Sequence, residues 1–231
     1  MRKEHRIAVI IPALDEADSI AGVVSAQPDW VDTVVVVDNG SNDGTAAQAH
    51  GAGAAVIHEA RRGYGAACLA GLRAVTAYPI VVFTDGDGSN DPSDMAALVA
   101  PLLAGKADLV IGSRVLGNAE QGALGAVQRF GNALSCNLMR LLWRRRFTDL
   151  GPYRAVTQEA LGRLNMEEPA MGWTIEMQVK ALRRGLRVVE VPVACRRRVT
   201  GRSKISGSLI GSMRAGTRIL YVIFRARLVG G

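Results

Sequence analysis

Short apolar runs alternate with helical stretches through the first half of the chain. The apolar runs, which predict strands, are residues 7–11, 33–37, 54–58, 80–84 and 108–112. The stretches between them, which predict helices, are residues 15–26, 44–50, 63–77 and 92–104. Strands joined by helices of this length form βαβ units with parallel strands. The pattern therefore predicts an α/β fold with a Rossmann-like, mostly parallel central sheet and helices on both faces.

The second half of the chain departs from this alternation. It predicts a long helix at 124–143, a short strand or turn at 149–156, a helix at 173–184, an extended segment at 186–198 and a final helix at 206–228. Pro192 interrupts the extended segment, which suits a strand at the edge of the sheet. We therefore expect one catalytic domain over residues 1–205, followed by a C-terminal helix over residues 206–231.

Acidic residues follow three of the predicted strands. Asp85-Gly86-Asp87 follows the strand at 80–84, Asp38 follows the strand at 33–37, and Glu16 lies beyond the first strand. The carboxyl ends of parallel strands form the ligand-binding edge of open α/β sheets. Paired carboxylates beside glycines suit Mg²⁺ or Mn²⁺ carrying a phosphate ligand, although Asp-x-Asp alone is equally compatible with a polar turn. No glycine-rich dinucleotide or Walker pattern follows the first strand, which disfavours a dehydrogenase or an NTPase.

Basic residues are concentrated in the C-terminal fifth of the chain. Residues 181–231 contain 12 Lys and Arg but a single acid, Glu190, in a chain of net charge +7. Such a block attracts the phosphates of lipids, nucleic acids or substrates, or forms a solvated charged face. We do not expect nucleic-acid binding, because aromatic residues make up only 5% of the chain and no stacking motif interleaves the arginines.

The cysteines and the N-terminus indicate a cytoplasmic protein. Cys68, Cys136 and Cys195 are widely spaced and match no disulfide or zinc pattern, so a reducing compartment fits best. The charged start of the chain lacks the features of a signal peptide, and no run of about 18 apolar residues predicts a spanning helix. The sequence does not predict an oligomeric state.

Six motifs in a fixed order resemble those of a known family. They are Ile11-Pro12-Ala13-Leu14-Asp15-Glu16, Val37-Asp38-Asn39-Gly40-Ser41-Asn42-Asp43-Gly44-Thr45, Arg62-Gly63-Tyr64-Gly65-Ala66-Ala67, Asp85-Gly86-Asp87, Gly112-Ser113-Arg114 and Asp149-Leu150-Gly151-Pro152-Tyr153-Arg154. The combination resembles the inverting family-2 glycosyltransferases of the A-type fold, and among them the polyprenyl-phosphate sugar transferases of the dolichol-phosphate mannose synthase type. The resemblance implies transfer of a hexose from a UDP- or GDP-linked sugar to a polyprenyl or dolichyl phosphate, with a divalent metal.

The resemblance also implies which residues bind the donor and the metal. Asp38 would face the base of the nucleotide, and Asp87 would ligate the metal, with Asp85 beside it. Ser89 stands where this branch often has a glutamine ligand, so it is the third expected metal residue. The expected nucleotide-sugar contacts are Pro12, Leu14, Glu16, Asp38, Arg62, Gly63, Asp85 and Gly86.

On the acceptor side, the resemblance implies cations that hold an anionic phosphate. The expected phosphate contacts are Arg114, Arg129, Arg202 and Lys204, and the expected catalytic residues are Asp149, Glu176 and Arg202. A lipid phosphate is already anionic, whereas a hydroxyl acceptor would need a carboxylate to take its proton. Glu176 equally fits a helix ion pair with Lys180 at i+4. Trp173 fits either stacking on a sugar or filling the core.

The C-terminal helix has an amphipathic, basic pattern. Leu209, Met213, Leu220 and Phe224 share one face, and three arginines at 214, 218 and 225 lie opposite. This pattern suits peripheral contact with an anionic membrane at the inner face, or packing of the apolar face on the domain itself. Two other functions remain open: transfer to a hydroxyl acceptor and nucleotidyl transfer. The latter is disfavoured because the segment at 12–16 is not a glycine-rich activating loop.

Overall fold

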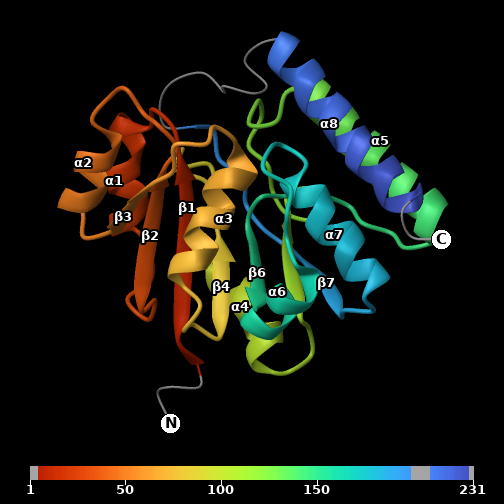
Figure 1. Cartoon of the computed structure of the whole chain (residues 1–231), viewed down its shortest axis with the longest axis horizontal. Helices are drawn as coiled ribbons and strands as arrows, with labels where there is room; N and C mark the ends of the chain where they lie inside the picture. Colours follow the sequence, from red (N-terminus) through yellow and green to blue (C-terminus); the bar gives the residue numbers. More distant parts are fainter. Residues whose placement is uncertain (1–4, 199–208, 229–231) are drawn as a thin grey trace.

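The computed structural model describes residues 5–198 and 209–228 and has the predicted α/β architecture (Figure 1). The strands are β1 (Ile7–Ala13), β2 (Thr33–Asp38), β3 (Ala55–His58), β4 (Ile80–Phe83), β5 (Leu109–Ser113), β6 (Arg154–Thr157) and β7 (Val188–Pro192). The helices are α1 (Ala17–Ser25), α2 (Thr45–Gly51), α3 (Tyr64–Ala74), the short 3₁₀ helix η2 (Pro92–Asp94), α4 (Met95–Leu103), α5 (Ala126–Trp143), α6 (Gln158–Leu164), α7 (Trp173–Arg183) and α8 (Leu209–Leu228).

Within the described residues, the strands form one seven-stranded sheet in the order β3-β2-β1-β4-β6-β5-β7. The strands β1 to β4 are mutually parallel, and β7 is parallel to β5. The strand β6 runs antiparallel between β4 and β5. The carboxyl ends of β1, β2 and β4 therefore lie side by side, as the sequence predicted.

Alternating residues of the strands build a core on each face of the sheet. Ile10 and Phe83 point to the face covered by α3, α6 and α7, whereas Val9 and Val82 point to the face covered by α1, α2 and α4. The helix α3 approaches the sheet closely because it is rich in Gly and Ala. A Cβ added at Gly71 would lie 2.6 Å from Ile10 Cγ2, so only glycine fits there.

A third layer lies beside the sheet, where α8 packs along α5 and α7 (Figure 1). The buried face of α8 consists of Ile219, Val222, Ile223 and Ala226. The sequence placed the apolar face elsewhere. Met213 and Phe224 are 64% and 50% exposed, and the side chain of Leu209 lies outside the described residues. The helix packs on the domain through a different face from the one that the helical wheel indicated, because residues 219–224 are apolar almost all round it. The exposure of Met213 and Phe224 is compatible with the membrane alternative.

Two further boundaries differ from the sequence expectations. Residues 149–153 form a loop, and the strand β6 begins at Arg154; the helix α6 that follows it was not predicted. Thr157 caps α6 by accepting a hydrogen bond from the Ala160 amide at 3.1 Å, a short local signal that the sequence reading missed. The extended segment around Pro192 is the edge strand β7, as predicted.

Candidate active site

The loops after β1 and β2 are joined by side-chain to backbone hydrogen bonds. The Asp15 amide donates to Ser41 Oγ at 2.9 Å, and the Glu16 amide donates to Thr45 Oγ1 at 2.8 Å. Asp15 has a φ of 47°, a left-handed conformation that Asp tolerates in tight turns. Pro12 pairs with Val37 near the end of β1, and Leu14 lies in the bend that follows. These loops form one wall at the carboxyl edge of the sheet.

Asp38 is buried at the end of β2. Its carboxylate accepts a hydrogen bond from the Ser41 amide at 3.0 Å and lies 3.1 Å from His58 Nδ1. Burial acts to raise the pKa of Asp38, but the hydrogen bonds from Ser41 and the charge of His58 outweigh it and hold the pKa below its usual value. Asp38 is therefore an ionised acceptor, which suits the recognition of N–H or O–H groups.

Asn39 positions the loop that carries Arg62 and Gly63. Its side-chain amide donates to the carbonyls of Glu59 and Arg61, and its Oδ1 accepts the Gly63 amide at 2.7 Å. Gly63 has a φ of 141°, and a Cβ there would lie 2.2 Å from the Pro169 carbonyl oxygen. The Arg62 guanidinium lies against Gly40, so both predicted residues line the same wall as Asp38.

Asp85 and Asp87 lie just beyond β4, as predicted. Burial and the neighbouring charge of Asp87 raise the pKa of Asp85 from 3.8 to about 7. Asp87 Oδ1 accepts the Ser89 amide at 2.9 Å, which fixes the turn. The Gly86 carbonyl accepts a hydrogen bond from Ser19 Oγ at 2.8 Å, so the turn is also tied to α1.

Arg198 brings a positive charge to these carboxylates. Its Nη2 donates to Glu16 Oε1 at 2.6 Å, and its Nε lies 3.0 Å from Asp87 Oδ2. The sequence counted Arg198 among the basic residues of the C-terminal fifth, and no role was predicted for it. Its proximity to the aspartates lowers the pKa of Asp85 in opposition to burial.

The carboxylates fit a divalent metal that a substrate shares. Among the described residues, no group of three or more His, Cys, Asp or Glu side chains could hold a metal ion by itself. Mg²⁺ is usually bound through one or two carboxylates, with substrate phosphates and water completing the shell. Burial and the charge of Asp87 raise the pKa of Asp85, and a divalent cation at the pair would oppose both effects. The Ser89 amide donates a hydrogen bond to Asp87, and its hydroxyl makes no side-chain hydrogen bond within the part of the chain that the structure describes.

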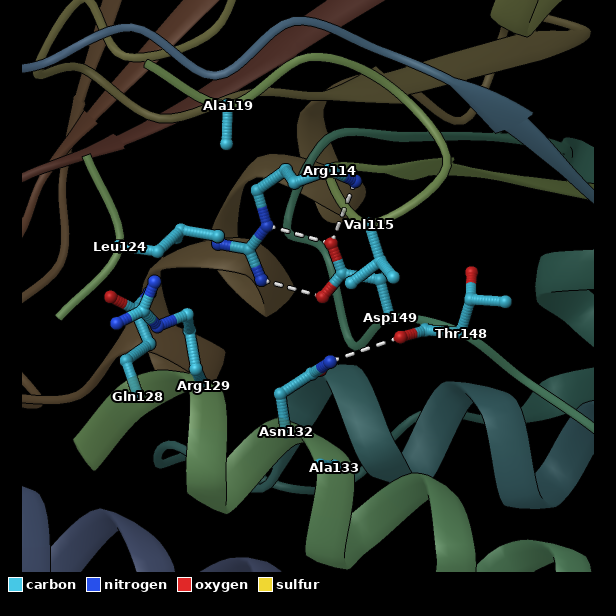
Figure 2. Close-up of a pocket in the computed structure, with 10 residues that line it drawn as sticks. All are labelled: Arg114, Val115, Ala119, Leu124, Gln128, Arg129, Asn132, Ala133, Thr148 and Asp149. Carbon is cyan, nitrogen blue, oxygen red and sulfur yellow. Dashed lines mark hydrogen bonds and ion pairs between the residues drawn. The ribbon is translucent and has the colours of Figure 1, made fainter. Parts of the chain in front are cut away.

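A cavity of about 340 Å³ lies on the acceptor side of the sheet (Figure 2). Two residues of the predicted phosphate group, Arg114 and Arg129, line it together with Asp149. The remaining lining residues, several of them from α5, are Val115, Ala119, Leu124, Gln128, Asn132, Ala133 and Thr148. Arg114 lies close enough to Asp85 to lower its pKa, so the cavity adjoins the carboxylates. The structure therefore brings Arg114, Arg129 and Asp149 into one pocket.

Arg114 and Asp149 form a bidentate ion pair at the base of this cavity. Arg114 Nε and Nη2 donate to the two carboxylate oxygens of Asp149, each at 2.7 Å, and the Arg114 amide donates at 2.9 Å. Their side chains are only 11% and 1% exposed. Asp149 therefore positions Arg114. It is poorly arranged to accept a proton, because both of its oxygens already accept hydrogen bonds.

Glu190 and Asn132 hold the loop that carries Asp149. Glu190, on β7, accepts hydrogen bonds from the amides of Thr148 and Asp149 at 2.9 and 3.1 Å. Asn132, on α5, donates to the Thr148 carbonyl at 3.0 Å and accepts the Leu150 amide at 2.8 Å (Figure 2). Neither residue was predicted, because such loop contacts depend on pairing across 16 to 42 residues of sequence.

Several predicted residues lie away from this pocket or outside the described residues. Glu176 forms the ion pair with Lys180 at 2.9 Å that the helix spacing allowed, and it also accepts the Glu168 amide. Trp173 is buried and packs edge-on against Phe83, with the two ring centroids 5.9 Å apart, which confirms its place in the core. Arg129 is exposed at the pocket mouth. Arg202 and Lys204 lie outside the described residues.

The family model described as glycosyl transferase family 2 matches residues 8–162, a span that contains the carboxylates and the start of the acceptor side. The chain belongs to glycosyltransferase family 2. A glycosyltransferase of Mycobacterium tuberculosis with no assigned substrate is 39% identical over 211 residues, which cover 90% of this chain and 93% of the relative. The polyprenol monophosphomannose synthase of Mycolicibacterium smegmatis is 32% identical, over 91% of this chain and 84% of the relative. The predicted family is confirmed, and its polyprenyl-phosphate branch is represented among the relatives.

A solved structure supports both the fold and the metal chemistry. Glucosyl-3-phosphoglycerate synthase from Mycobacterium tuberculosis, crystallised with Mn²⁺, UDP-glucose and phosphoglyceric acid, superposes with a TM-score of 0.80 at 25% identity, over 96% of this chain and 80% of that one. The predicted A-type glycosyltransferase fold is therefore confirmed, and the predicted divalent cofactor is consistent with this neighbour. Within the described residues, no helix is both long and apolar enough to cross a membrane.

Proposed function

We propose that this glycosyltransferase moves a hexose from a nucleotide-sugar to a polyprenyl phosphate, with inversion at the anomeric carbon and with Mg²⁺ or Mn²⁺ as cofactor. The observation that carries the proposal is the acceptor pocket. It offers arginine side chains to a phosphate, while the described carboxylates beside it are engaged in ion pairs and hydrogen bonds.

We assign the nucleotide-sugar donor to the wall formed by the loops after β1 and β2 and to the carboxylates after β4. Asp38 would accept hydrogen bonds from the base, while Arg62 and the Gly63 segment would lie beside the ribose and phosphates. Asp85 and Asp87 would hold the metal, which supplies Lewis-acid stabilisation to the departing nucleoside diphosphate. The residues at the carboxyl ends of β1, β2 and β4 would then orient the donor with its anomeric carbon towards the Arg114 side.

The acceptor chemistry follows from the state of the carboxylates. A hydroxyl acceptor needs a general base within hydrogen-bond reach. Asp149 is bound at both oxygens by Arg114, and Glu176 is bound by Lys180 and by backbone amides. A lipid phosphate attacks as an anion and needs no such base. Arg129 at the mouth and Arg114 at the base of the pocket would hold that phosphate.

A second candidate acceptor is a small phosphorylated acid. The solved neighbour was crystallised with phosphoglyceric acid, and a pocket of about 340 Å³ has room for a molecule of that size. The exposed apolar residues of α5 favour the lipid. Val127, Phe130 and Leu134 form an exposed stripe on the helix that lines the pocket, with Phe130 69% exposed. A polyprenyl chain would have an apolar path along this stripe.

The same helices would make peripheral contact with a membrane. The outer sides of α5 and α8 expose the large apolar residues Val127, Phe130, Leu134, Leu141, Met213, Tyr221, Phe224 and Leu228. Residues 126–146 and α8 carry nine arginines and no acid, a composition complementary to anionic lipid headgroups. A second copy of this chain would present the same positive charge, which disfavours self-association there.

The proposal is tested by offering labelled UDP- and GDP-hexoses with polyprenyl phosphate or with phosphoglyceric acid, and by identifying the product by mass. We expect a hexosyl polyprenyl phosphate that forms only with Mg²⁺ or Mn²⁺ and is lost in EDTA. Arg129→Ala should raise the KM for the acceptor more than that for the donor. A glycosylated phosphoglyceric acid would establish the second candidate instead, and full activity in EDTA would remove the metal. Co-sedimentation with anionic but not neutral vesicles tests the membrane contact.

A further inference from the structure

Arg198 places its guanidinium between two acidic side chains that would otherwise repel each other. Its guanidinium bridges Glu16, beyond β1, and Asp87, beyond β4, two residues that are separated by 71 positions in the sequence. The side chain is 22% exposed, and the two carboxylates are 12% and 14% exposed. The guanidinium is thus a largely buried cation between two largely buried anions.

The backbone fixes this placement. After β7 the chain runs beside the loop that follows β4: the Ala194 amide donates to Asp94 Oδ2 at 2.7 Å, and the Arg196 amide donates to the Ser89 carbonyl at 2.8 Å. Side chains alternate along this extended segment. Arg196 pairs with Asp91, whereas the Arg197 side chain donates to the Gln121 carbonyl, so Arg198 returns to the carboxylate side.

The two contacts of the Arg198 guanidinium differ in hydrogen-bond geometry. Nη2 makes a short hydrogen bond to Glu16 at 2.6 Å. Nε lies 3.0 Å from Asp87 Oδ2 but lacks hydrogen-bond geometry, and it is a buried donor without a hydrogen-bond partner among the described residues. A buried donor that is left unsatisfied is costly. The contact with Asp87 is therefore the weaker end and is held mainly by charge.

We propose that Arg198 is the internal counter-ion of Asp87, and that it competes with the divalent metal for this carboxylate. The inference rests on the proposed metal role of Asp87. Before metal binds, Arg198 offsets the repulsion among the carboxylates and keeps the loops after β1 and β4 together. When metal binds, the guanidinium leaves Asp87 and stays tethered to Glu16. A cation at that position is then directed towards the diphosphate that the metal also contacts.

The exchange needs no movement of the backbone. An arginine side chain has several rotatable bonds, and Glu16 provides a pivot that is independent of the metal. A cation displaced from Asp87 also avoids the repulsion that it would feel beside a divalent ion. The geometry therefore predicts opposite effects of Arg198 on two ligands: it weakens the binding of metal alone and strengthens the binding of the nucleoside diphosphate with metal.

The test measures binding, independently of turnover. Mn²⁺ affinity is titrated by calorimetry or electron paramagnetic resonance in the full chain, without nucleotide, for the parent, Arg198→Ala and Arg198→Gln. Arg197→Ala is the matched control, because the neighbouring arginine contacts residues outside the site. We expect about tenfold tighter Mn²⁺ binding for both Arg198 variants, and parental affinity for the control. UDP or GDP, whichever the parent binds, should bind the Mn²⁺-loaded Arg198 variants about tenfold more weakly.

Two outcomes would overturn the inference. In the first, the parent binds Mn²⁺ and both folded Arg198 variants bind it no more tightly than the parent. The metal site would then exist, but Arg198 would not compete for it. If the parent binds no Mn²⁺ with or without nucleotide, the metal role of Asp87 fails first and the competition fails with it. Thermal melts of each variant exclude misfolding as the cause, and the glutamine variant keeps a hydrogen-bonding group if the alanine variant does not fold.

Discussion

Removing the Asp149 carboxylate should be among the most destabilising single changes in the acceptor pocket. In Asp149→Ala, Arg114 keeps its charge in a nearly buried position but loses all three of its hydrogen bonds to Asp149. Breaking a buried ion pair by removing one partner costs about 3–5 kcal/mol, because the remaining charge has no compensation. Stabilities of whole domains are about 5–15 kcal/mol, so the loss is a large fraction of the total.

The double variant Arg114→Met/Asp149→Leu separates charge from packing. It removes both charges and fills the space with apolar atoms, a replacement that is often neutral for buried pairs. We therefore expect it to be more stable than Asp149→Ala by about 2 kcal/mol or more, although it should have lost acceptor binding. Arg73→Ala is the control, because the pair of Arg73 with Glu59 at 3.0 Å is on the surface. Its loss should cost about 1 kcal/mol or less.

The assay is urea unfolding followed by circular dichroism and tryptophan fluorescence, with the free energy of unfolding obtained by linear extrapolation. A loss of under about 1 kcal/mol in Asp149→Ala would refute the reasoning, since it would mean that Arg114 finds water or another partner. If the double variant loses as much stability as Arg114→Met and Asp149→Leu lose separately when summed, the reasoning is also refuted, because the coupling energy would then be zero.

Three further changes test other parts of the structure. Asp85→Asn should stabilise the metal-free protein. The pKa of Asp85 is raised from 3.8 to about 7, so ionisation of this carboxyl destabilises the parent as pH rises through that window, by up to about 4 kcal/mol above pH 7. Melting temperatures in EDTA should therefore differ between variant and parent at pH 8 and converge near pH 4. Gly65→Ala should lower the melting temperature and weaken nucleotide binding, because its Cβ would lie 1.9 Å from the Glu168 carbonyl oxygen; unchanged melting would mean that this contact can relax. Arg218→Ala should loosen α8, which Arg218 ties to Glu168 through two hydrogen bonds of 2.8 Å, and hydrogen exchange should rise in α8 but not in α3.

The donor half of the site was predictable because it depends on local order. Periodicity placed β1, β2 and β4, and parallel connection then required Glu16, Asp38 and Asp85 to meet at one edge. No long-range contact had to be known. Four of the six motifs that resembled the family lie in this half, and the family model matches it from residue 8.

The other half could not be predicted in the same way, because its contacts join distant segments. Arg198 meets Glu16 across 182 residues, and Glu190 meets Thr148 across 42. The antiparallel insertion of β6 between β4 and β5 also has no signature in periodicity. The packed face of α8 could not be predicted for a related reason: residues 219–224 are apolar almost all round the helix, so its neighbours α5 and α7 decide which side packs.

The position of β6 divides the sheet into two parts that coincide with two stretches of sequence. The strands β1 to β4 are complete before residue 84, whereas the pocket beside Arg114 is lined by residues 114–149, between the end of β5 and the start of β6. Gly105, with a φ of 62° and open space around its Cα, lies in the turn between them. Under the proposed function, recombination at this turn would exchange the acceptor pocket between family members and keep the strands of the nucleotide wall. Such an exchange would have to preserve the contacts that cross it, from Arg198 to Glu16 and from Pro169 to Gly63.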